Sequence, residues 1–287
     1  MSDYYYLNGT LMLSGSCQIS VTDRSYLFGD GLFETILVQN SKPLYLSQHL
    51  NRLQHSAGFF AYNLPSREEL LEAMQLVIEA NALENGSIRL TVSPRESQRL
   101  LAKTNSTLNL LITLRHGRLY SEELYEQGFT AIIAQTTRRN EYSPLSRHKT
   151  TNFADSILAK REALLSGSNE AILLNTAGRL TEATVANLFL VINGEVLTPP
   201  IADGILPGII REKVLELCQD LNIPAREQTM TPQDLEEAEE VFITNSLMGV
   251  MPIREIQSLN FSDKVTRQLA TALRTVMSAE GAAAPSR

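Results

Sequence analysis

Residues 145–153 read Leu-Ser-Arg-His-Lys-Thr-Thr-Asn-Phe, and the interpretation of this chain starts from the lysine at their centre, Lys149. Two further segments follow in the sequence: Thr181-Glu182-Ala183 and the run Gly204-Ile205-Leu206-Pro207-Gly208-Ile209-Ile210-Arg211. An amine, a carboxylate and a glycine-rich turn therefore come in this order. Taken singly, each has an ordinary explanation as a surface lysine, a solvated loop carboxylate or a plain turn.

Length and charge limit the classes of protein to consider. The chain has 287 residues, 43% of them hydrophobic, which is enough to bury the core of one large domain or of two ordinary ones, and we expect two. The 25 Lys and Arg residues are outnumbered by 32 Asp and Glu residues, and the formal net charge is -7. This balance does not favour a nucleic acid partner, although a local basic pocket for a small anion is compatible with it.

The cysteines and histidines give no sign of a disulfide framework or a metal site. Cys17 and Cys218 lie far apart and form no Cys-x-x-Cys pair. The four histidines do not have the spacing of metal ligands; they are His49, His55, His116 and His148. The sequence has no basic-then-apolar leader at its start and no apolar run long enough to cross a bilayer. We expect a cytoplasmic protein with no metal and no membrane partner.

The hydrophobic pattern predicts an α/β (α+β) fold with a smaller first domain, residues 1–118. Its strands are expected at Tyr4–Leu7, Gly31–Val38, Ser87–Ser93 and Leu108–Leu114. One helix is expected over Ser47–Phe60. A second begins at Ser66, because Ser66-Arg67-Glu68-Glu69 has the spacing of a capping box.

The larger second domain is expected at residues 119–278, after a polar segment that has glycines at both ends. Its strands are predicted at Thr130–Gln135, Glu170–Leu174, Asn187–Ile192 and Val241–Thr244. Its helices are predicted at Thr151–Leu165, which Lys149 would open, Gly208–Leu221 and Ser262–Met277, with a short acidic helix after Thr231-Pro232. The alanine-rich residues 279–287 are predicted to be a disordered tail.

The residue types around Lys149 and Glu182 suit one kind of chemistry. A lysine whose pKa is lowered by burial and by neighbouring cations can bond to an aldehyde and later act as a base, and Arg147 and His148 are compatible with that effect. A carboxylate such as that of Glu182 can keep a pyridine nitrogen protonated. Together with an anion-binding turn, these groups favour a pyridoxal phosphate enzyme.

The phosphate of such a cofactor needs backbone amides and a fixed positive charge. The helix expected to begin at Gly208 offers the amides of Ile209 and Ile210 together with its dipole. Ser246 offers a hydroxyl at the end of a strand, and Arg52 offers a bidentate cation. The ordinary alternatives are a loop serine and a helix-surface arginine.

Six segments in this order resemble the fold-type IV pyridoxal phosphate enzymes. That family includes branched-chain aminotransferases, D-amino acid aminotransferases and 4-amino-4-deoxychorismate lyases, and the resemblance extends over nearly the whole chain. The segments are Phe28-Gly29-Asp30-Gly31-Leu32-Phe33-Glu34-Thr35, His49-Leu50-Asn51-Arg52-Leu53, Lys149 to Ala163, Leu180 to Asn187, Gly204 to Arg211, and Thr244 to Ile253.

The resemblance implies a role for each matching residue. Lys149 would bond to the cofactor aldehyde and act as acid and base, and Glu182 would contact the pyridine nitrogen. The phosphate-binding group would be Arg52, Ile209, Ile210 and Ser246, with Asn245 also among the cofactor-binding residues. At the position of Ile210, some aminotransferases have a threonine whose hydroxyl also reaches the phosphate. In this chain, Ile210 can offer only its backbone amide to the phosphate. The family also implies two domains with the cofactor in the cleft between them, and a homodimer.

Two features favour the lyase within this family. Thr35 stands where branched-chain aminotransferases typically have glycine, and the run from Asn245 to Pro252 is similar to the lyase version of that segment. The implied reaction converts 4-amino-4-deoxychorismate to 4-aminobenzoate and pyruvate in folate biosynthesis, with Thr35 as a hydrogen-bonding catalytic group. The alternatives are that Thr35 is an ordinary strand threonine and that the chain is an aminotransferase for D-amino or branched-chain amino acids.

The substrate loop departs from the family pattern. Relatives tend to have Ser/Thr-Arg-Gly where this chain reads Ser93-Pro94-Arg95-Glu96-Ser97-Gln98-Arg99. Arg95 or Arg99 could bind a substrate carboxylate, since the guanidinium fork suits that group, or either could be a solvated loop arginine. A non-catalytic ligand-binding protein stays open as another class. A nucleotide site is less favoured, because Gly29-Asp30-Gly31 lacks a third glycine.

Overall fold

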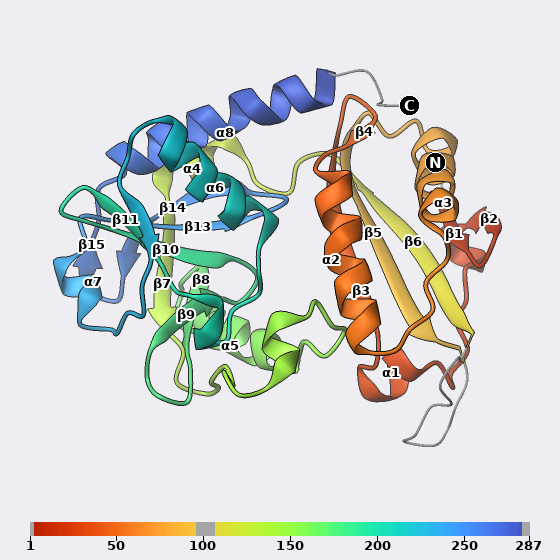
Figure 1. Cartoon of the computed structure of the whole chain (residues 1–287), viewed down its shortest axis with the longest axis horizontal. Helices are drawn as coiled ribbons and strands as arrows, with labels where there is room; N and C mark the ends of the chain where they lie inside the picture. The colour runs from red at the N-terminus through yellow and green to blue at the C-terminus, as the bar shows by residue number, and fades with distance from the viewer. Residues whose placement is uncertain (1–2, 96–106, 283–287) are drawn as a thin grey trace. The chain divides into compact units, whose positions relative to one another are not determined.

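The computed structural model describes residues 3–95 and 107–282. The chain divides into two compact units. The N-terminal unit comprises Met1–Leu119, His148–Phe153 and Ser278–Arg287, and the C-terminal unit comprises Tyr120–Arg147 and Ala154–Met277. Each unit contains a β-sheet with helices, as Figure 1 shows, so the expected mixed α/β class is confirmed.

The N-terminal unit is built on a six-stranded antiparallel sheet with strand order β2-β1-β6-β5-β3-β4. Its strands are β1 (Tyr4–Leu7), β2 (Thr10–Leu13), β3 (Leu32–Gln39), β4 (Lys42–Pro43), β5 (Asn85–Pro94) and β6 (Leu108–His116). Its helices are α1 (Arg24–Phe28), α2 (Leu46–Phe59) and α3 (Arg67–Ala80), with a 3-10 turn at Ser14–Ser16. All four strands predicted in this part are present, and the short strands β2 and β4 were not predicted.

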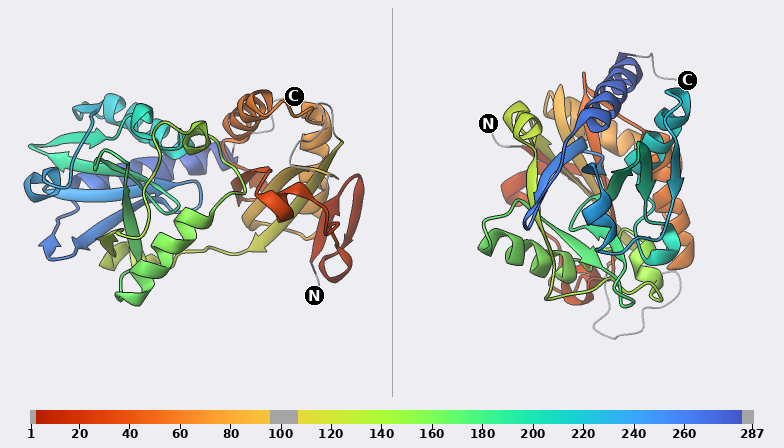
Figure 2. Two further views of the ribbon diagram at one scale, coloured as in Figure 1. Left: turned by 90° about the horizontal axis from the view of Figure 1, so that it is seen from below. Right: turned by 90° about the vertical axis from the view of Figure 1, so that its left-hand side faces the viewer.

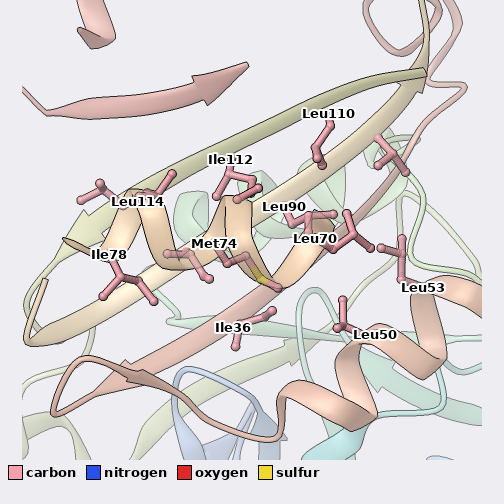
Figure 3. Packing of buried hydrophobic residues seen from close by; sticks show 14 of the residues in the cluster. Ile36, Leu50, Leu53, Leu70, Met74, Ile78, Leu90, Leu110, Ile112 and Leu114 are labelled. Carbon is pink, nitrogen blue, oxygen red and sulfur yellow. The ribbon is translucent and has the colours of Figure 1, made fainter. Parts of the chain in front are cut away.

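The core of the N-terminal unit lies between one face of this sheet and the helices α2 and α3. Successive side chains of a strand point to opposite faces, so Ile36 of β3, Leu90 of β5 and Ile112 of β6 project to the same side. Leu53 of α2 and Met74 of α3 pack against them (Figure 3). The opposite face of the sheet is more polar, and it includes Thr35 and Arg89, which are described below.

The C-terminal unit is built on a nine-stranded sheet (Figure 2). Its strands are β7 (Phe129–Ile133), β8 (Glu170–Leu174), β9 (Leu180–Ala183), β10 (Asn187–Ile192), β11 (Glu195–Thr198), β12 (Ala225–Glu227), β13 (Glu240–Asn245), β14 (Gly249–Ile256) and β15 (Leu259–Asn260). Its helices are α4 (Glu122–Gln127), α5 (Ala154–Leu165), α6 (Ile209–Asp220), α7 (Asp234–Glu237) and α8 (Lys264–Ala282), whose last residues belong to the N-terminal unit, and there are 3-10 turns at Pro144–Arg147 and Ile201–Asp203.

The second sheet closes on itself. The strands run in the order β10-β13-β14-β7-β8-β9, and β9 pairs with β10 as well as with β8. The single registered pair at this closure is Glu182 of β9 with Asn187 of β10. The closure therefore fixes the backbone position of the carboxylate that the sequence analysis selected.

The segment around Lys149 pairs with β3 and does not open a helix. The amide of Phe33 donates to the carbonyl of Lys149 at 3.0 Å, and the amide of Thr151 donates to that of Gly31 at 2.9 Å. Leu32 and Thr150 form an antiparallel bridge. Helix α5 begins only at Ala154, and residues 148–153 group with the N-terminal unit rather than with the surrounding residues 119–278.

The last helix is longer than the sequence indicated. Helix α8 continues to Ala282, so residues 279–282 are helical where a disordered tail was expected, and residues 283–287 lie outside the described part. Alanine and glutamate favour helix, and the Glu280 carboxylate accepts the backbone N–H of Tyr45 at 2.8 Å. None of the described helices is long and apolar enough to cross a membrane.

The capping box of α3 can be tested against a matched serine. The Ser66 hydroxyl accepts the amide of Glu69, and the Glu69 carboxylate accepts the amide of Ser66. Ser121 stands at the same position of α4 but makes no side-chain capping bond. Ser66→Ala should lower the free energy of unfolding by about 1 kcal/mol in urea titrations. Ser121→Ala should cost clearly less, and equal losses would contradict the assignment.

Candidate active site

Lys149 lies against the aromatic ring of Phe33. The Lys149 ammonium nitrogen is 4.6 Å from the ring centroid, at the distance of a cation–π contact. Phe153 contacts the same ring edge-on, with centroids 6.0 Å apart. Together with the hydrogen bond from the Phe33 amide to the Lys149 carbonyl, these contacts hold the lysine segment on the first residues of β3.

The glycines of the Gly29-Asp30-Gly31 run give the lysine segment room to approach. A Cβ atom on Gly29, which has φ of 68°, would lie 3.2 Å from the Cα of Asn152. A Cβ atom on Gly31 would lie 2.9 Å from the Cβ of Ser25 and 3.1 Å from the hydroxyl of Thr151. The two glycines therefore serve the packing of one chain segment on another.

Arg52 forms a buried bidentate ion pair with Glu34. The Nε and Nη2 atoms of Arg52 donate to Oε1 and Oε2 of Glu34 at 2.8 and 2.6 Å, and the Glu34 side chain is 1% exposed. His49, one helical turn earlier on α2, contacts the same carboxylate through Nδ1 at 2.7 Å. This network fixes Arg52, a candidate for binding phosphate, on β3, and the sequence analysis assigned no role to Glu34 within it.

Burial and charge act on the pKa values of this network. Burial alone would raise the pKa of Glu34, but the charge and hydrogen bonds of Arg52, aided by His49, outweigh it and lower the pKa to about 2. Burial lowers the pKa of His49, opposed by Glu34 and supported by the charges of Arg52 and Lys149. Glu34 is therefore ionised and His49 is mostly neutral at pH 7.

Thr35 and Arg89 are opposite each other on the polar face of the same sheet. Thr35 of β3 is registered with Arg89 of β5, and both point away from the face that holds Glu34. The guanidinium carbon of Arg89 is 3.5 Å from the centroid of Phe33, whose ring also contacts Lys149. Arg89 was not among the residues predicted from the sequence, although its place between the apolar residues Ile88 and Leu90, both buried in the structure, could have indicated a residue on the polar face.

Arg95, one of two candidates for binding a substrate carboxylate, makes backbone contacts. Its Nε donates to the carbonyl of Leu108 at 3.0 Å, and its amide donates to Thr107 at 2.9 Å. Arg95 thus ties the end of β5 to the start of β6. The second candidate, Arg99, lies outside the described residues.

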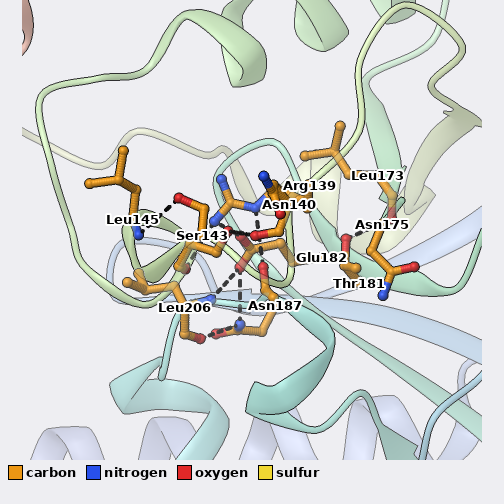
Figure 4. A network of polar contacts seen from close by, with 12 residues as sticks. Arg139, Asn140, Ser143, Leu145, Leu173, Asn175, Thr181, Glu182, Asn187 and Leu206 are labelled. Carbon is orange, nitrogen blue, oxygen red and sulfur yellow. Dashed lines mark hydrogen bonds and ion pairs between the residues drawn. The ribbon is translucent and has the colours of Figure 1, made fainter. Parts of the chain in front are cut away.

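Glu182 is the centre of a polar network in the C-terminal unit (Figure 4). Its Oε1 pairs with Nη2 of Arg139 at 2.7 Å, and its Oε2 accepts the amide of Leu206 at 3.0 Å and the Asn187 side chain at 3.4 Å. Asn187 also donates to the carbonyl of Leu206 at 2.8 Å. The positive charge and the donors favour the ionised carboxylate. Nothing in the sequence marked Arg139, because the pair joins distant segments.

A row of side chains continues from Glu182 across the neighbouring strands. Asn187 of β10 is registered with Glu182 on one side and with Thr244 of β13 on the other, so the three lie on one face of the sheet. The Thr244 hydroxyl is buried, and it has no hydrogen-bond partner among the residues that the structure describes. A buried hydroxyl in this state can take a polar ligand group.

The glycines of the second motif accommodate close contacts from other segments. Gly204 has φ of 91°, and a Cβ atom there would lie 2.9 Å from the Cα of Glu141. A Cβ atom on Gly208 would lie 1.8 Å from Oδ1 of Asn187. Gly208 is the N-cap of α6 and no described side chain caps the helix, so the amides of Ile209 and Ile210 form an uncapped N-terminus beside Asn187.

Asn245 forms a turn, and Ser246 follows it. The Asn245 side chain accepts the amides of Leu247 and Met248, both at 2.9 Å, and donates to the carbonyl of Val185 at 3.1 Å. Its polar groups are therefore engaged by the backbone, and the structure gives it the role of shaping the turn. Ser246 is half-buried in that turn.

A model of the aminotransferase class IV family matches residues 31–256. The chain belongs to this family. It is 30% identical to a putative branched-chain-amino-acid aminotransferase of Methanocaldococcus jannaschii, over 94% of this chain and 93% of the relative. It is 29% identical to the D-alanine aminotransferase of Bacillus licheniformis, over 96% and 97% of the two chains.

Solved structures of both reaction types are similar to this chain. The Escherichia coli branched-chain amino acid aminotransferase has a TM-score of 0.92 and 26% identity, with 98% of this chain and 96% of the other covered. A putative 4-amino-4-deoxychorismate lyase from Legionella pneumophila has a TM-score of 0.84 and 30% identity, with 91% and 96% covered. These likenesses support the family and its fold without separating the two activities.

The cofactor of this family is pyridoxal 5'-phosphate, which confirms the cofactor expected from the sequence. One branched-chain amino acid aminotransferase with the same fold was solved with pyridoxamine 5'-phosphate. The residues of this chain fit such a group. The uncapped start of α6 and the buried Thr244 hydroxyl suit a phosphate, and the Glu182 carboxylate beside Arg139 suits a protonated ring nitrogen.

The Glu34 network makes stability depend on pH. The Glu34 carboxyl has a pKa of about 2 in the folded protein, against about 4.3 in an unfolded chain, so it contributes stability above the unfolded pKa, and this is lost as the pH falls towards 2. The lowered pKa of His49 acts in the same direction below about pH 6.5. The melting temperature measured by thermal unfolding should fall as the pH is lowered from about 6.5 towards 2. Glu34→Gln should flatten the fall, whereas the exposed control Glu68→Gln should leave it unchanged.

The contact between Gly208 and Asn187 predicts a costly substitution. Gly208→Ala puts a methyl group onto the Asn187 side chain, so it should lower the free energy of unfolding by about 1–3 kcal/mol and weaken cofactor binding by displacing Asn187 and Glu182. The control is Gly58→Ala on α2, where nothing lies within 4 Å of the added Cβ. Wild-type stability and cofactor affinity in Gly208→Ala would show that the contact is not as close as the structure has it.

Proposed function

We propose that this protein is a pyridoxal phosphate-dependent lyase that converts 4-amino-4-deoxychorismate to 4-aminobenzoate and pyruvate. The observation that carries the choice of lyase is the position of Thr35. Its hydroxyl lies on the same sheet face as Phe33, whose ring contacts Lys149. A further support is the likeness to lyase structures, including that of Pseudomonas aeruginosa with a TM-score of 0.83, 27% identity, and 94% and 98% of the two chains covered.

Each cofactor-facing residue has a task that its surroundings suit. When bound, pyridoxal phosphate supplies an aldehyde for an amine and a protonated ring that withdraws electrons from a carbon losing its proton. Lys149 provides the amine and moves that proton. Glu182, kept ionised by Arg139, holds the proton on the ring nitrogen. Arg52, the amides of Ile209 and Ile210, and the hydroxyls of Ser246 and Thr244 bind the phosphate.

The substrate is held by residues on the polar face of the N-terminal sheet. Arg89 is the stronger candidate for binding a substrate carboxylate than Arg95, because Arg95 is engaged by the carbonyl of Leu108 whereas Arg89 is exposed beside Thr35. Thr35 donates a hydrogen bond to the oxygen that leaves as part of pyruvate. In the lyase reaction, the bond between the ring carbon and this oxygen breaks and the ring loses a proton to become aromatic.

An aminotransferase is the second candidate. It is favoured by the sequence relatives, since the M. jannaschii and B. licheniformis proteins at 30% and 29% identity are both named aminotransferases. Lys149, Glu182 and the phosphate-binding residues would have the same tasks in that reaction. For either activity we propose a homodimer, as the resemblance implies.

The two activities separate in a pair of assays on the purified protein. With 4-amino-4-deoxychorismate, the lyase should release pyruvate and 4-aminobenzoate in equal amounts. With D-alanine or leucine and 2-oxoglutarate, it should give little amino transfer. Brisk amino transfer without pyruvate from the first substrate would replace the lyase by the aminotransferase, and neither activity would favour a ligand-binding protein.

Lys149→Ala tests the chemistry that both candidates share. The variant should lose the visible absorption of the lysine-bound cofactor. Its turnover rate should fall by more than about 100-fold, since the same amine bonds to the cofactor and transfers the proton. Lys213→Ala, which removes a lysine paired with Glu216 on α6, is the control and should retain both properties. Full turnover in Lys149→Ala would remove this lysine from the mechanism.

A further inference from the structure

One side of helix α2 reaches both β3 and the lysine segment. His49, Arg52, Ser56 and Phe59 follow each other at helical spacing, so they lie along one side of α2. The first two contact Glu34 of β3. The last two contact a residue that has no role in the proposed chemistry so far, His148.

His148 is buried in a pocket made by α2 and the residue after it. Its ring stacks on Phe59 with centroids 4.6 Å apart and an interplanar angle of 26°, and it meets Phe60 edge-on at 5.6 Å. The ring of His55, also on α2, has its centroid 5.8 Å from that of His148. The Nδ1 atom of His148 is 3.0 Å from the hydroxyl of Ser56, and both residues are buried. These contacts are enough to fix the ring in one orientation.

The residue after His148 is Lys149, whose carbonyl is held by the amide of Phe33. The peptide that joins the two residues is therefore anchored on one side by α2 and on the other by β3. Because Arg52 lies one turn before Ser56 on the same helix, α2 places the His148 anchor and the Arg52 guanidinium on one rigid element.

We propose that His148 is a positioning residue, which sets Lys149 at a fixed distance from Arg52. The inference rests on the proposed function, in which Lys149 reacts with the cofactor aldehyde and Arg52 binds its phosphate. A rigid cofactor has a fixed span between these groups, so the lysine reacts quickly only if its backbone is held at the matching distance. His148 acts through the backbone of Lys149 and touches no reacting atom.

The hydrogen bond and the stacking contribute differently. A stacked ring can slide and turn in its own plane at little cost, because dispersion contacts have no preferred direction. A hydrogen bond to the Ser56 hydroxyl has a preferred direction and starts from a rigid helix. The hydrogen bond to Ser56 therefore sets the position of His148, and the aromatic contacts supply most of the stabilisation.

Three variants separate positioning from packing. His148→Asn keeps a polar atom near the place of Nδ1 and loses the stacking. The double variant His148→Phe with Ser56→Ala keeps an aromatic ring and leaves no buried hydroxyl without a partner. His116→Phe is the control, because His116 is exposed and pairs only with Asp3 among the described acidic residues.

The main readout is the rate at which pyridoxal phosphate becomes attached to Lys149 in apoprotein, trapped with borohydride and located by peptide mapping. Melting temperatures of the apoprotein and turnover rates are measured alongside. The double variant should melt close to wild type and label Lys149 about tenfold more slowly or worse. His148→Asn should melt lower yet label faster than the double variant, and His116→Phe should match wild type.

The outcomes also separate this inference from the proposed function. Wild-type labelling in the double variant would overturn the positioning role while leaving the cofactor chemistry intact. Faster labelling in the double variant than in His148→Asn would likewise overturn it, because packing alone would then decide the rate. Wild-type protein that is not labelled at Lys149 would overturn the proposed function, and this inference with it.

Discussion

The buried ion pair between Glu34 and Arg52 is the constraint on which the candidate residues of the N-terminal unit depend. It joins β3, which carries Thr35 and pairs with the Lys149 segment, to α2, which carries Arg52. Burying such a pair brings a large desolvation penalty, and an apolar pair could give equal stability. The two directional hydrogen bonds of the pair instead fix the position of α2 along β3, which an apolar contact would not fix.

The candidate residues around Glu182 in the C-terminal unit depend on the closure of its sheet. Glu182 is registered with Asn187 where β9 meets β10, and Arg139 and the amide of Leu206 complete the surroundings of the carboxylate. The Arg139 guanidinium and the N–H donors of Leu206 and Asn187 all contact the Glu182 carboxylate. A site of this kind is preorganised, because the groups that orient the carboxylate belong to the backbone and to packed side chains.

Local patterns predicted much of the fold and part of the site. The alternation in β5 and the Ser66 capping box were sufficient for their elements, and the ordered motifs were sufficient for the family and its cofactor. Local patterns gave wrong or missing predictions where contacts between distant segments determine the structure. Lys149 was expected to open a helix, but Thr150 pairs with Leu32 at the start of β3 and Thr151 with Gly31 just before it. Arg89 gains its importance from strand register and Arg139 from an ion pair with the distant Glu182, and no short window of sequence contains either.

The approach of Asn187 to Gly208 links two positions that are distant along the chain. With 1.8 Å between the amide oxygen of Asn187 and the place of a Cβ atom on Gly208, position 208 cannot take a side chain while Asn187 keeps its place. Among descendants of this sequence, a side chain in place of the glycine becomes tolerable only after the asparagine has been exchanged for something smaller. That exchange would remove the cross-strand neighbour and hydrogen-bond donor of Glu182, so the surroundings of the carboxylate depend on the absence of a side chain at position 208.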